Sequence, residues 1–377
     1  MAATLPELLV RLAERGGSDL HLAPHAPPHL RIDGELEGQE DLEPLTEARV
    51  RQLVYSLLTD DQRERFESGM ELDAALDVPE VGRVRCNVFR RRGAVAAAYR
   101  LIPGAIPDLE RLDLPPAVAG FARLPQGLVL VTGATGSGKS TTLAALVDRV
   151  NRERRAHILT IEDPIEYVHP HRRCLVNQRE VQADTCSFAT ALRAALREDP
   201  DVVLIGEMRD LETVEAALRI AETGHLTLAT LHTSSAVQTV TRIIDVFPPH
   251  RQAQVRTQLS LVLAGVVCQT LVPRVAGPGR LCAAEVMTPT FAIRNLIRED
   301  KLHQVYSAMQ AGQDRFGMQT MSQALARLHA GGHIALEEAL ARSPHPDEVR
   351  QLLGRDGARQ HSSRGPGRRR SGAGGTP

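Results

Sequence analysis

Short apolar stretches alternate with one helical stretch in the first hundred residues of the chain. Thr46 begins the helical stretch, in which apolar residues between positions 50 and 58 share one face. The turn at Asp33-Gly34 is a hairpin signal. Strand patterns cover residues 20–22, 30–32, 84–89 and 94–101. The pattern therefore predicts a small α+β domain over residues 1–102.

A Pro- and Gly-rich stretch over residues 103–117 interrupts this pattern and predicts a linker. Buried strands are then expected at residues 127–132, 157–161, 202–206 and 226–231, with helical stretches between them. This alternation predicts an α/β core over residues 118–353, built on a mostly parallel sheet with helices on both faces. From Leu259 to Leu353 we expect mainly helices.

The C-terminal stretch, residues 354–377, is rich in Gly, Ser, Pro and Arg and cannot bury apolar surface. We expect it to be a disordered basic tail. Such a tail could contact RNA or lipid, but a solvated terminus is the simpler interpretation.

A glycine-rich loop separates the first core strand from the helix that follows it. Residues 133–140, Gly-Ala-Thr-Gly-Ser-Gly-Lys-Ser, have the spacing of a Walker A loop. Backbone N–H groups in such a loop bind phosphates at the positive end of the helix. The predicted ATP-binding residues are Gly133, Thr135, Gly136, Ser137, Gly138, Lys139, Ser140 and Thr141, and Ser140 is also the predicted Mg²⁺ ligand. The alternative is a glycine-rich turn that matches the spacing by chance.

The choice of cation at position 139 supports this interpretation. Lys139 and Lys301 are the only lysines among the 45 Lys and Arg residues of the chain. A compact ammonium on a flexible stem can reach the β- and γ-phosphates, whereas a planar guanidinium is bulkier and prefers bidentate partners. A chain that otherwise uses arginine has thus kept lysine where phosphate chemistry requires it.

The overall composition disfavours a nucleic-acid translocase. The formal net charge is -1 and the pI is about 6.9, so no bulk attraction draws the chain to nucleic acid or anionic lipid. Aromatic residues make up only 3% of the chain and Trp is absent, so bases would find few stacking partners. The core must be built mainly from Leu, Val, Ile and Ala.

Cysteine usage and the absence of targeting signals indicate a cytoplasmic protein. None of the five cysteines forms a C-x-x-C pair, which fits a reduced compartment and argues against a structural zinc site. The N-terminus has no basic region followed by an apolar stretch. The longest apolar-leaning segment, residues 259–272, is short for a bilayer span and is interrupted by Ser260 and Gln269.

Two clusters of carboxylates follow predicted strands. Residues 201–207 form a Walker B-like strand that ends in Glu207, with Gly206 where many members of the P-loop superfamily carry Asp. The second cluster follows the strand at 157–161 and contains Glu162, Asp163 and Glu166. An isolated carboxylate at a strand end is usually a solvated loop residue or a helix cap. Because ligands bind at the carboxyl ends of parallel strands, we interpret Glu166 and Glu207 as catalytic and leave Glu162 and Asp163 open.

Two histidines frame the last predicted core strand. A lone His is most often a satisfied core residue, and His225 is closer to that interpretation. His232 would emerge at the carboxyl end of the strand, where a neutral imidazole can hydrogen-bond the γ-phosphate or a catalytic Glu. We therefore predict that His232 senses ATP hydrolysis through this hydrogen bond.

The motifs together resemble the secretion ATPase superfamily, and within it the retraction ATPases of type IV pili, over nearly the whole chain. The similarity includes residues 18–22 and 31–36, the Walker A loop, the Asp box (residues 161–169), residues 195–213, the His box (residues 224–235) and residues 317–320. Residues 292–299 resemble the segment that separates retraction from assembly ATPases. Physically this segment is a helix that has Ala292, Ile293, Leu296 and Ile297 on one face and leaves Arg294, Asn295, Arg298 and Glu299 exposed. An ordinary packed amphipathic helix is the alternative.

The resemblance implies a RecA-like ATPase core, an N-terminal PAS-like domain and a homohexameric ring that uses ATP and Mg²⁺. It implies that Arg85 and Arg100 contact phosphate; without it, solvated surface arginines would be favoured, since Arg83 and residues 90–92 crowd the same region. It also implies that Glu166 and Glu207 orient water and metal. The implied partner is the inner-membrane platform protein of the pilus, with peripheral membrane association through partners at the cytoplasmic face of the inner membrane.

Two functions follow from these observations. The first is a hexameric ATP-hydrolysing motor for pilus retraction, since assembly ATPases carry a tetracysteine zinc module that Cys268 and Cys282 alone cannot build. The second is a catalytically weak accessory subunit that regulates another pilus motor. The complete set of Lys139, Glu166, Glu207 and His232 speaks against the second.

Overall fold

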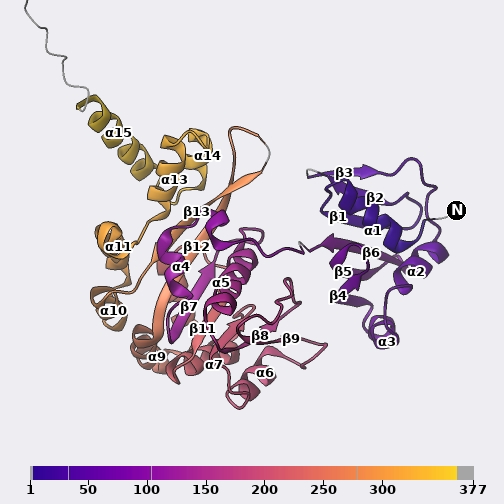
Figure 1. The fold of residues 1–377 in the computed structure, drawn as a ribbon, viewed down its shortest axis with the longest axis horizontal. Helices are drawn as coiled ribbons and strands as arrows, with labels where there is room; N and C mark the ends of the chain where they lie inside the picture. The colour runs from indigo at the N-terminus through magenta and orange to yellow at the C-terminus, as the bar shows by residue number, and fades with distance from the viewer. Residues whose placement is uncertain (1–2, 33, 103, 278, 363–377) are drawn as a thin grey trace, which may run out of the picture. The chain divides into compact units, whose positions relative to one another are not determined.

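The computed structural model describes residues 3–32, 34–102, 104–277 and 279–362 (Figure 1). The chain divides into two compact units, one made of residues 1–108 and 144–207 and the other of residues 109–143 and 208–377. The domain limits expected from the sequence follow composition rather than contacts, and they stay predictions.

A six-stranded antiparallel sheet forms the N-terminal part of the first unit (Figure 1). Its strands run in the order β3-β2-β1-β6-β5-β4. They are β1 (Asp19–Leu22), β2 (His29–Ile32), β3 (Glu35–Gly38), β4 (Glu71–Val78), β5 (Gly82–Arg91) and β6 (Ala94–Leu101). All four strands predicted here are confirmed, and part of the predicted hairpin turn, Asp33, lies outside the described residues.

Three helices accompany this sheet: α1 (Leu5–Glu14), α2 (Glu47–Tyr55) and α3 (Asp60–Gly69). Each begins after a threonine whose hydroxyl accepts a backbone N–H of the first turn, which satisfies one of the exposed donors of the helix. α1 buries Leu5, Leu8, Leu9 and Leu12, which recur at helical spacing, in a core shared with one face of the sheet. Each such leucine contributes about 1.5–3 kcal/mol when fully buried.

Strand β5 shows why the sheet has one apolar face and one charged face. Val84, Cys86 and Val88 belong to the buried core, so the residues between them, including Arg83 and Arg85, lie on the opposite face. The N-terminal sheet therefore presents a row of arginines on the face that α1 and α2 do not cover.

The second sheet has seven strands in the order β13-β12-β7-β11-β10-β8-β9. They are β7 (Gly127–Thr132), β8 (His157–Glu162), β9 (Leu175–Glu180), β10 (Val202–Ile205), β11 (Leu226–Leu231), β12 (Leu263–Pro273) and β13 (Arg280–Met287). β7 pairs in parallel with β11 and β12, and β8 pairs in parallel with β9 and β10. The four predicted core strands and the α/β class are confirmed.

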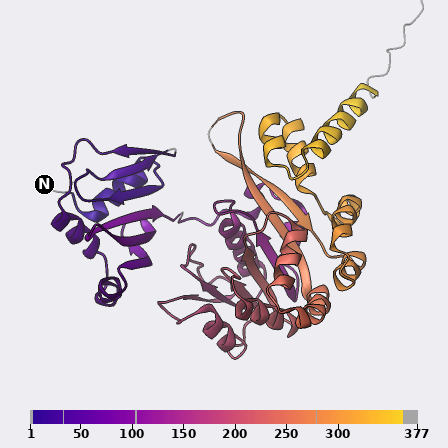
Figure 2. The same ribbon diagram turned by 180° about the vertical axis from the view of Figure 1, so that it is seen from behind.

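The expectation of mainly helices after Leu259 is wrong for β12 and β13. The apolar run from 263 to 272 is long enough for either element, and periodicity alone does not separate a buried strand from a buried helix. Val266 and Val267 favour a strand, and the run pairs in parallel with β7 over residues 263–268. β13 then returns antiparallel to β12, and the two form the long hairpin seen in Figure 2.

Further helices and two 3₁₀ turns lie between residues 109 and 316. They are the 3₁₀ turn Leu109–Leu112, α4 (Pro116–Phe121), α5 (Lys139–Glu153), α6 (Phe188–Ala195), α7 (Leu211–Glu222), α8 (Ala236–Asp245), α9 (Pro249–Val262), α10 (Phe291–Arg298), the 3₁₀ turn Leu302–Gln304, α11 (Val305–Ala311) and α12 (Gln313–Phe316). No helix in the described residues is long and apolar enough to cross a membrane.

Three C-terminal helices pack beside the β12–β13 hairpin (Figure 1). They are α13 (Met321–Ala330), α14 (Leu336–Arg342) and α15 (Pro346–Ser362), and they share an apolar cluster with Val272 and Leu281 of the hairpin. α15 extends to Ser362, and the rest of the predicted tail, residues 363–377, lies outside the described residues.

The predicted helix at residues 292–299 is present as α10, but its faces differ from the expectation. Ile293 and Ile297 are buried as predicted, whereas Ala292 is exposed. Arg294, which was expected to be exposed, is half-buried and donates to the carbonyl oxygens of Ser260 and Leu261 at 2.6 and 2.7 Å. The open carbonyls at the end of α9 explain this contact, since arginine supplies them with donors.

Candidate nucleotide site

The predicted Walker A loop leaves the sheet at the end of β7 and leads into α5. Gly133, Gly136 and Gly138 have φ values of 142°, 78° and 90°, in the region where side chains are disfavoured. A Cβ atom at Gly133 would also collide with the Gln269 carbonyl oxygen and the Ser137 hydroxyl. The three glycines therefore give the loop a backbone course that other residues would resist.

Lys139 folds back over the loop that precedes it. The residue is 9% exposed, and its Nζ donates to the carbonyl oxygens of Gly133 and Ala134, both at 3.0 Å. These contacts hold the ammonium against the backbone of the loop. Ser137 is also buried, and its hydroxyl has no hydrogen-bond partner among the described residues.

Strand β12 contacts the Walker A loop and the first turn of α5. The sequence did not predict this support. Gln269 is 5% exposed and its amide donates to the Thr142 hydroxyl at 2.9 Å, in the first turn of α5. The Thr132 hydroxyl donates to the Cys268 sulfur at 2.9 Å. Gln269 had appeared only as a polar interruption of an apolar stretch; a glutamine in a buried strand was the available signal.

His232 emerges where it was predicted. β11 and β7 pair in parallel with Leu231 opposite Thr132, so His232 and Gly133 leave the sheet as neighbours at the same edge. The exposed position of His232 leaves it accessible to a ligand. The ordinary alternative of a buried core histidine is excluded for this residue, whereas His225 does hydrogen-bond the Ile220 carbonyl at 3.0 Å.

In the first unit, the two carboxylate clusters also meet at one sheet edge. β8 and β10 pair in parallel with Ile161 opposite Ile205, so Glu162 and Gly206 leave the sheet side by side, and Glu207 follows. A Cβ atom at Gly206 would lie 3.2 Å from the Cα of Glu162. This close approach gives a physical reason for glycine at position 206, because a larger residue would press on β8.

Glu162 is held in an unusual environment for a carboxylate. Burial raises its pKa to about 7, although hydrogen bonds from Thr160 and Gln178 oppose the shift, and the charge of nearby Glu166 adds to it. The Thr160 hydroxyl donates to Glu162 Oε1 at 2.7 Å and the Gln178 amide donates to the same oxygen at 3.1 Å. The sequence analysis assigned no role to Glu162. These contacts show that its carboxylate is held by hydrogen bonds at the start of the Asp box.

Arg85 and Arg100 lie directly opposite one another on β5 and β6. Arg100 Nε donates to Asp19 Oδ1 at 2.7 Å, and Asp19 is 7% exposed on the adjoining strand β1. Arg85 lies at 4.0 Å from Asp73, and both side chains remain partly exposed. Two like charges thus face each other across the ladder, and a carboxylate lies beside each of them.

Glu285 is a further residue that the sequence analysis missed. It lies on β13 and is 1% exposed. Its carboxylate accepts the backbone N–H of Ala236, at the start of α8, at 2.7 Å and that of Met321, at the start of α13, at 3.3 Å. Burial raises the pKa of Glu285, and these two N–H groups oppose the shift. One carboxylate thus joins the helix after the His box to the C-terminal helices.

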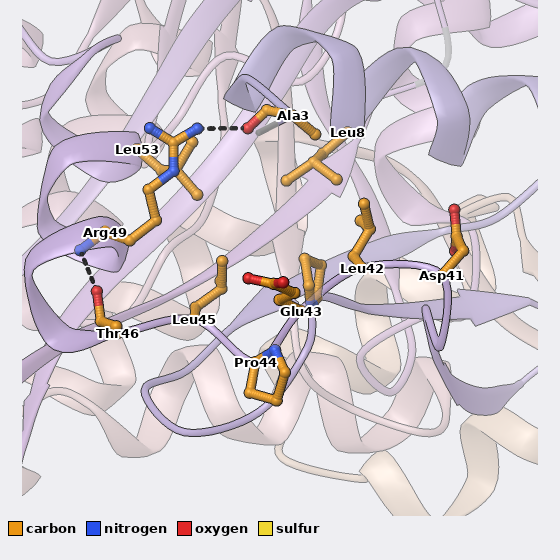
Figure 3. A pocket seen from close by; sticks show the side chains of 11 residues that line it. Ala3, Leu8, Asp41, Leu42, Glu43, Pro44, Leu45, Thr46, Arg49 and Leu53 are labelled. Carbon is orange, nitrogen blue, oxygen red and sulfur yellow. Dashed lines mark hydrogen bonds between the residues drawn. The ribbon is translucent and has the colours of Figure 1, made fainter. Parts of the chain in front are cut away.

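A separate groove of about 550 Å³ lies in the N-terminal domain beside α1 and α2 (Figure 3). Its walls are mainly apolar, with Leu8 and Leu53 on the two helices. Arg49 points its guanidinium to the Ala3 carbonyl oxygen at 2.7 Å. Asp41 and Glu43 also line the groove, and their carboxylates would repel phosphate groups. The groove is therefore not the nucleotide site.

The strand, loop and helix around Lys139 define the site of a P-loop ATPase. The chain matches the Type II/IV secretion system protein family over residues 110–315. It is 49% identical over 343 residues to the type IV pilus retraction ATPase PilT of Pseudomonas aeruginosa, covering 91% of this chain and 99% of that protein. It is 41% identical over 347 residues to the type IV pilus ATPase PilU of the same organism, covering 92% and 90%.

A solved structure agrees with these similarities. A crystal structure of the pilus retraction motor PilT with bound ADP superposes with a TM-score of 0.87 and 50% identity, covering 93% of this chain and 99% of that one. The chain therefore belongs to the Type II/IV secretion system protein family, and the resemblance found in the sequence is confirmed.

Proposed function

We propose that this chain is an ATP-hydrolysing motor that powers the retraction of type IV pili. The observation that carries the proposal is the phosphate-binding loop, with three left-handed glycines and a lysine folded over it, in a chain similar to PilT over 91% of its length. The proposed motor is a homohexamer at the cytoplasmic face of the inner membrane. It would act on the platform protein of the pilus and would not bind nucleic acid.

The residues of the loop fit a nucleoside triphosphate. The Ser137 hydroxyl, which has no hydrogen-bond partner within the part of the chain that the structure describes, and the backbone turn at Gly133, Gly136 and Gly138 provide polar groups at the start of α5, where the helix dipole favours anions. Lys139 would exchange its contacts with loop carbonyls for contacts with the β- and γ-phosphates. Thr135 and Thr141 complete the proposed binding segment.

Ser140, directly after Lys139, has the hydroxyl that would hold Mg²⁺. No group of three or more His, Cys, Asp or Glu residues among the described residues is arranged to hold a metal alone. This fits Mg²⁺, which takes few protein ligands in such sites and completes its shell with phosphates and water. When bound, the ion neutralises charge on the phosphates.

The acidic and imidazole side chains at the strand ends would act on the attacking water. We assign Glu166 and Glu207 to orienting the water and the metal, since both follow strands that end at one edge of the sheet. His232, at the end of β11, would hydrogen-bond the γ-phosphate or a catalytic carboxylate and so report hydrolysis.

Arg85 and Arg100 would supply positive charge to the phosphates within the ring. Their opposed position on β5 and β6 lets both guanidinium groups serve one anion. In the proposed hexamer each N-terminal domain packs on the core of a neighbour, so ATP binding would favour closure and hydrolysis would release it.

The purified chain provides the test of this function. Lys139→Ala and Glu207→Ala should keep the circular dichroism spectrum of the wild type and lose steady-state ATPase activity by at least about 100-fold. The wild type should sediment as a hexamer. Wild-type ATPase rates in both variants, or a monomer at every concentration, would remove the motor assignment.

The accessory subunit remains the second candidate, because the chain is also 41% identical to PilU. The two functions differ in what the chain achieves alone. A main motor hydrolyses ATP by itself and restores pilus retraction in a strain that lacks its own motor. An accessory subunit restores retraction only when an active motor is also present.

A further inference from the structure

Arg83 is one of the arginines that crowd strand β5, and it is not a solvated surface residue. Its side chain, on the charged face of β5, is 17% exposed. The guanidinium has two acceptors in the other part of its unit: Nη2 donates to Glu180 Oε2 at 2.6 Å and Nε donates to the Ile165 carbonyl oxygen at 3.0 Å. Its Nη1 atom also donates to Asp77 Oδ2 on the neighbouring strand β4 at 3.3 Å. The contacts with Glu180 and Ile165 join the N-terminal sheet to the Asp box and to the end of β9.

Glu180 completes the arrangement from the opposite side. Its side chain is 11% exposed, and the same Oε2 atom also accepts the backbone N–H of Ile165 at 3.1 Å. The N–H of Ile165 is therefore held by Glu180, and its C=O is held by Arg83. Glu166, the proposed catalytic carboxylate, is the next residue, so the peptide group that joins Ile165 to Glu166 and the peptide group before it are both held in place.

A second contact lies beside this one. Arg65 of α3 donates to the side-chain oxygen of Gln182 and, at 3.3 Å, to its carbonyl oxygen. Gln182 follows Glu180 in a turn, and Asp184 in that turn accepts the Glu180 backbone N–H at 2.8 Å. The turn that follows Glu180 is therefore also bound to the N-terminal domain, through Arg65.

The chemistry of the contact favours a positioning role. Burying a charge pair costs solvation, and an apolar pair of similar size would often stabilise a fold equally well. The charged pair offers direction instead, because a guanidinium donates along fixed lines and a carboxylate accepts along its own. Such directional bonds fix the peptide before Glu166 in one orientation.

We propose that Arg83 and Glu180 are positioning residues for Glu166 and make its placement depend on contact with the N-terminal sheet. This inference rests on the proposed function of Glu166. Arg83 and Arg85 lie on one face of β5, two residues apart. Movement of the strand that carries a phosphate-contacting arginine would therefore also release or restore the peptide that carries the water-orienting carboxylate.

Five single variants and one double variant of the full chain test the proposal. Arg83→Ala and Glu180→Gln each remove one side of the contact, and Arg83→Lys keeps the charge without the planar guanidinium. The matched control is Arg90→Ala, on the same strand, whose guanidinium contacts Glu67 and the Gly93 carbonyl oxygen. The readouts are kcat, KM, ADP affinity and amide hydrogen exchange of the peptide that contains Ile165.

We expect Arg83→Ala and Glu180→Gln to lower kcat by about 10- to 100-fold, as a misplaced catalytic group does. KM and ADP affinity should change by less than about threefold, because phosphate binding is untouched. The Ile165 amide should exchange about tenfold faster in both variants. Arg83→Lys should fall between the alanine variant and the wild type, and the double variant Arg83→Ala/Glu180→Gln should be no slower than either single variant.

The outcomes separate this inference from the proposed function. Wild-type kcat and wild-type exchange in Glu180→Gln, which keeps the size of the side chain, would overturn the positioning role even if Arg83→Ala does not fold. Equal loss in Arg90→Ala would reduce the effect to general destabilisation and also overturn it. Glu166→Gln is the reference: if it keeps wild-type kcat, the role of Glu166 is wrong and the positioning role fails with it.

Discussion

The Walker A loop and the Asp box, to which we assign parts of one reaction, take their shapes from different sources. The loop follows from its own glycines, whose backbone angles suit the turn, and from the strand and helix on either side. The Asp box follows from side chains distant in the sequence, such as Arg83 and Glu180. The shape of a motif can be predicted from the sequence when it depends on neighbouring residues. When it depends on distant residues, only the chemistry of the motif can be predicted.

Gln178 illustrates how far the Asp box depends on its neighbours. From β9 its amide nitrogen donates to Glu162 Oε1 at 3.1 Å and to the Tyr167 carbonyl oxygen at 2.9 Å. Its oxygen accepts the His169 backbone N–H at 2.7 Å. One side chain therefore fastens both ends of a segment whose own residues have no glycine turn to hold them.

The largest expected effect tests the local side of this comparison. Gly133→Ala should lower ATP affinity by at least about 100-fold, because the new Cβ meets the Gln269 carbonyl oxygen and Ser137 at a φ of 142°. Gly136→Ala is the matched control, since its φ is 78° but no atom lies within 4 Å of an added Cβ. We expect it to cost about 1–2 kcal/mol of stability through backbone strain alone. Equilibrium binding of a fluorescent ATP analogue measures the affinity of both variants, and urea unfolding measures the loss of stability in Gly136→Ala.

The two glycines should differ because the loop is confined at one of them and open at the other. Equal losses of affinity at Gly133 and Gly136 would show that backbone angle alone determines the loop. In that case the support from β12 would carry little of its shape, and the contrast with the Asp box would become sharper.

The second prediction concerns the distant side of the comparison. Gln178→Ala should lower the free energy of unfolding by about 1–3 kcal/mol, because it leaves the Tyr167 carbonyl and the His169 N–H without their partner. The control is Asn177→Ala on the same strand, where an exposed amide contacts His157. We expect less than about 0.5 kcal/mol there. Urea unfolding followed by circular dichroism, at one protein concentration, measures the difference.

If Gln178→Ala proves no more costly than Asn177→Ala, the Asp box does not depend on β9 for its shape. Its ordering would then have to come from the proline and the short-range contacts within the segment. Hydrogen exchange of residues 165–169 would show whether the segment itself loosens in the variant.

The sequence predicted most of the fold because the strongest patterns are local. The strands at 127–132 and 226–231 match β7 and β11 residue for residue, and the Walker A spacing identified the loop. The prediction of helix is wrong for β12, because an apolar run indicates burial but does not identify the partner strand that selects its conformation. Gln269 was missed for the same reason, because its role exists only where β12 lies behind the loop.

The candidate site shows the same division. His232 and Gly133 were expected at one sheet edge, and the register of β7 and β11 places them there. Arg83 was predicted to have no role of its own and counted only among the arginines that crowd its strand, because spacing cannot tell which arginine meets a buried carboxylate. Its pairing with Glu180, 97 positions further along the chain, is a tertiary contact that no local pattern encodes.

Two buried titratable groups in the Asp box give the smallest expected effect in the wild type. Burial raises the pKa of Glu162 to about 7 from 4.5 and lowers the pKa of His169 to about 4 from 6.5. Between about pH 4.5 and 7 the folded state keeps a proton on Glu162 that the unfolded state loses, so stability falls as pH rises. Between about pH 4 and 6.5 the unfolded state binds a proton on His169 that the folded state refuses, so stability rises with pH.

These two dependences have opposite signs over most of one pH window, so they should largely cancel in the wild type. Glu162→Gln should remove the first and reveal stability that increases by about 1–3 kcal/mol from pH 4.5 to 6.5. His169→Phe should remove the second and reveal stability that decreases over the same range. Urea unfolding across this window measures both slopes. The loop residues 133–141 contain no comparable pair of opposed titrating groups. If the dependence of stability on pH stays the same in both variants, Glu162 and His169 are as open to water as residues of an ordinary loop.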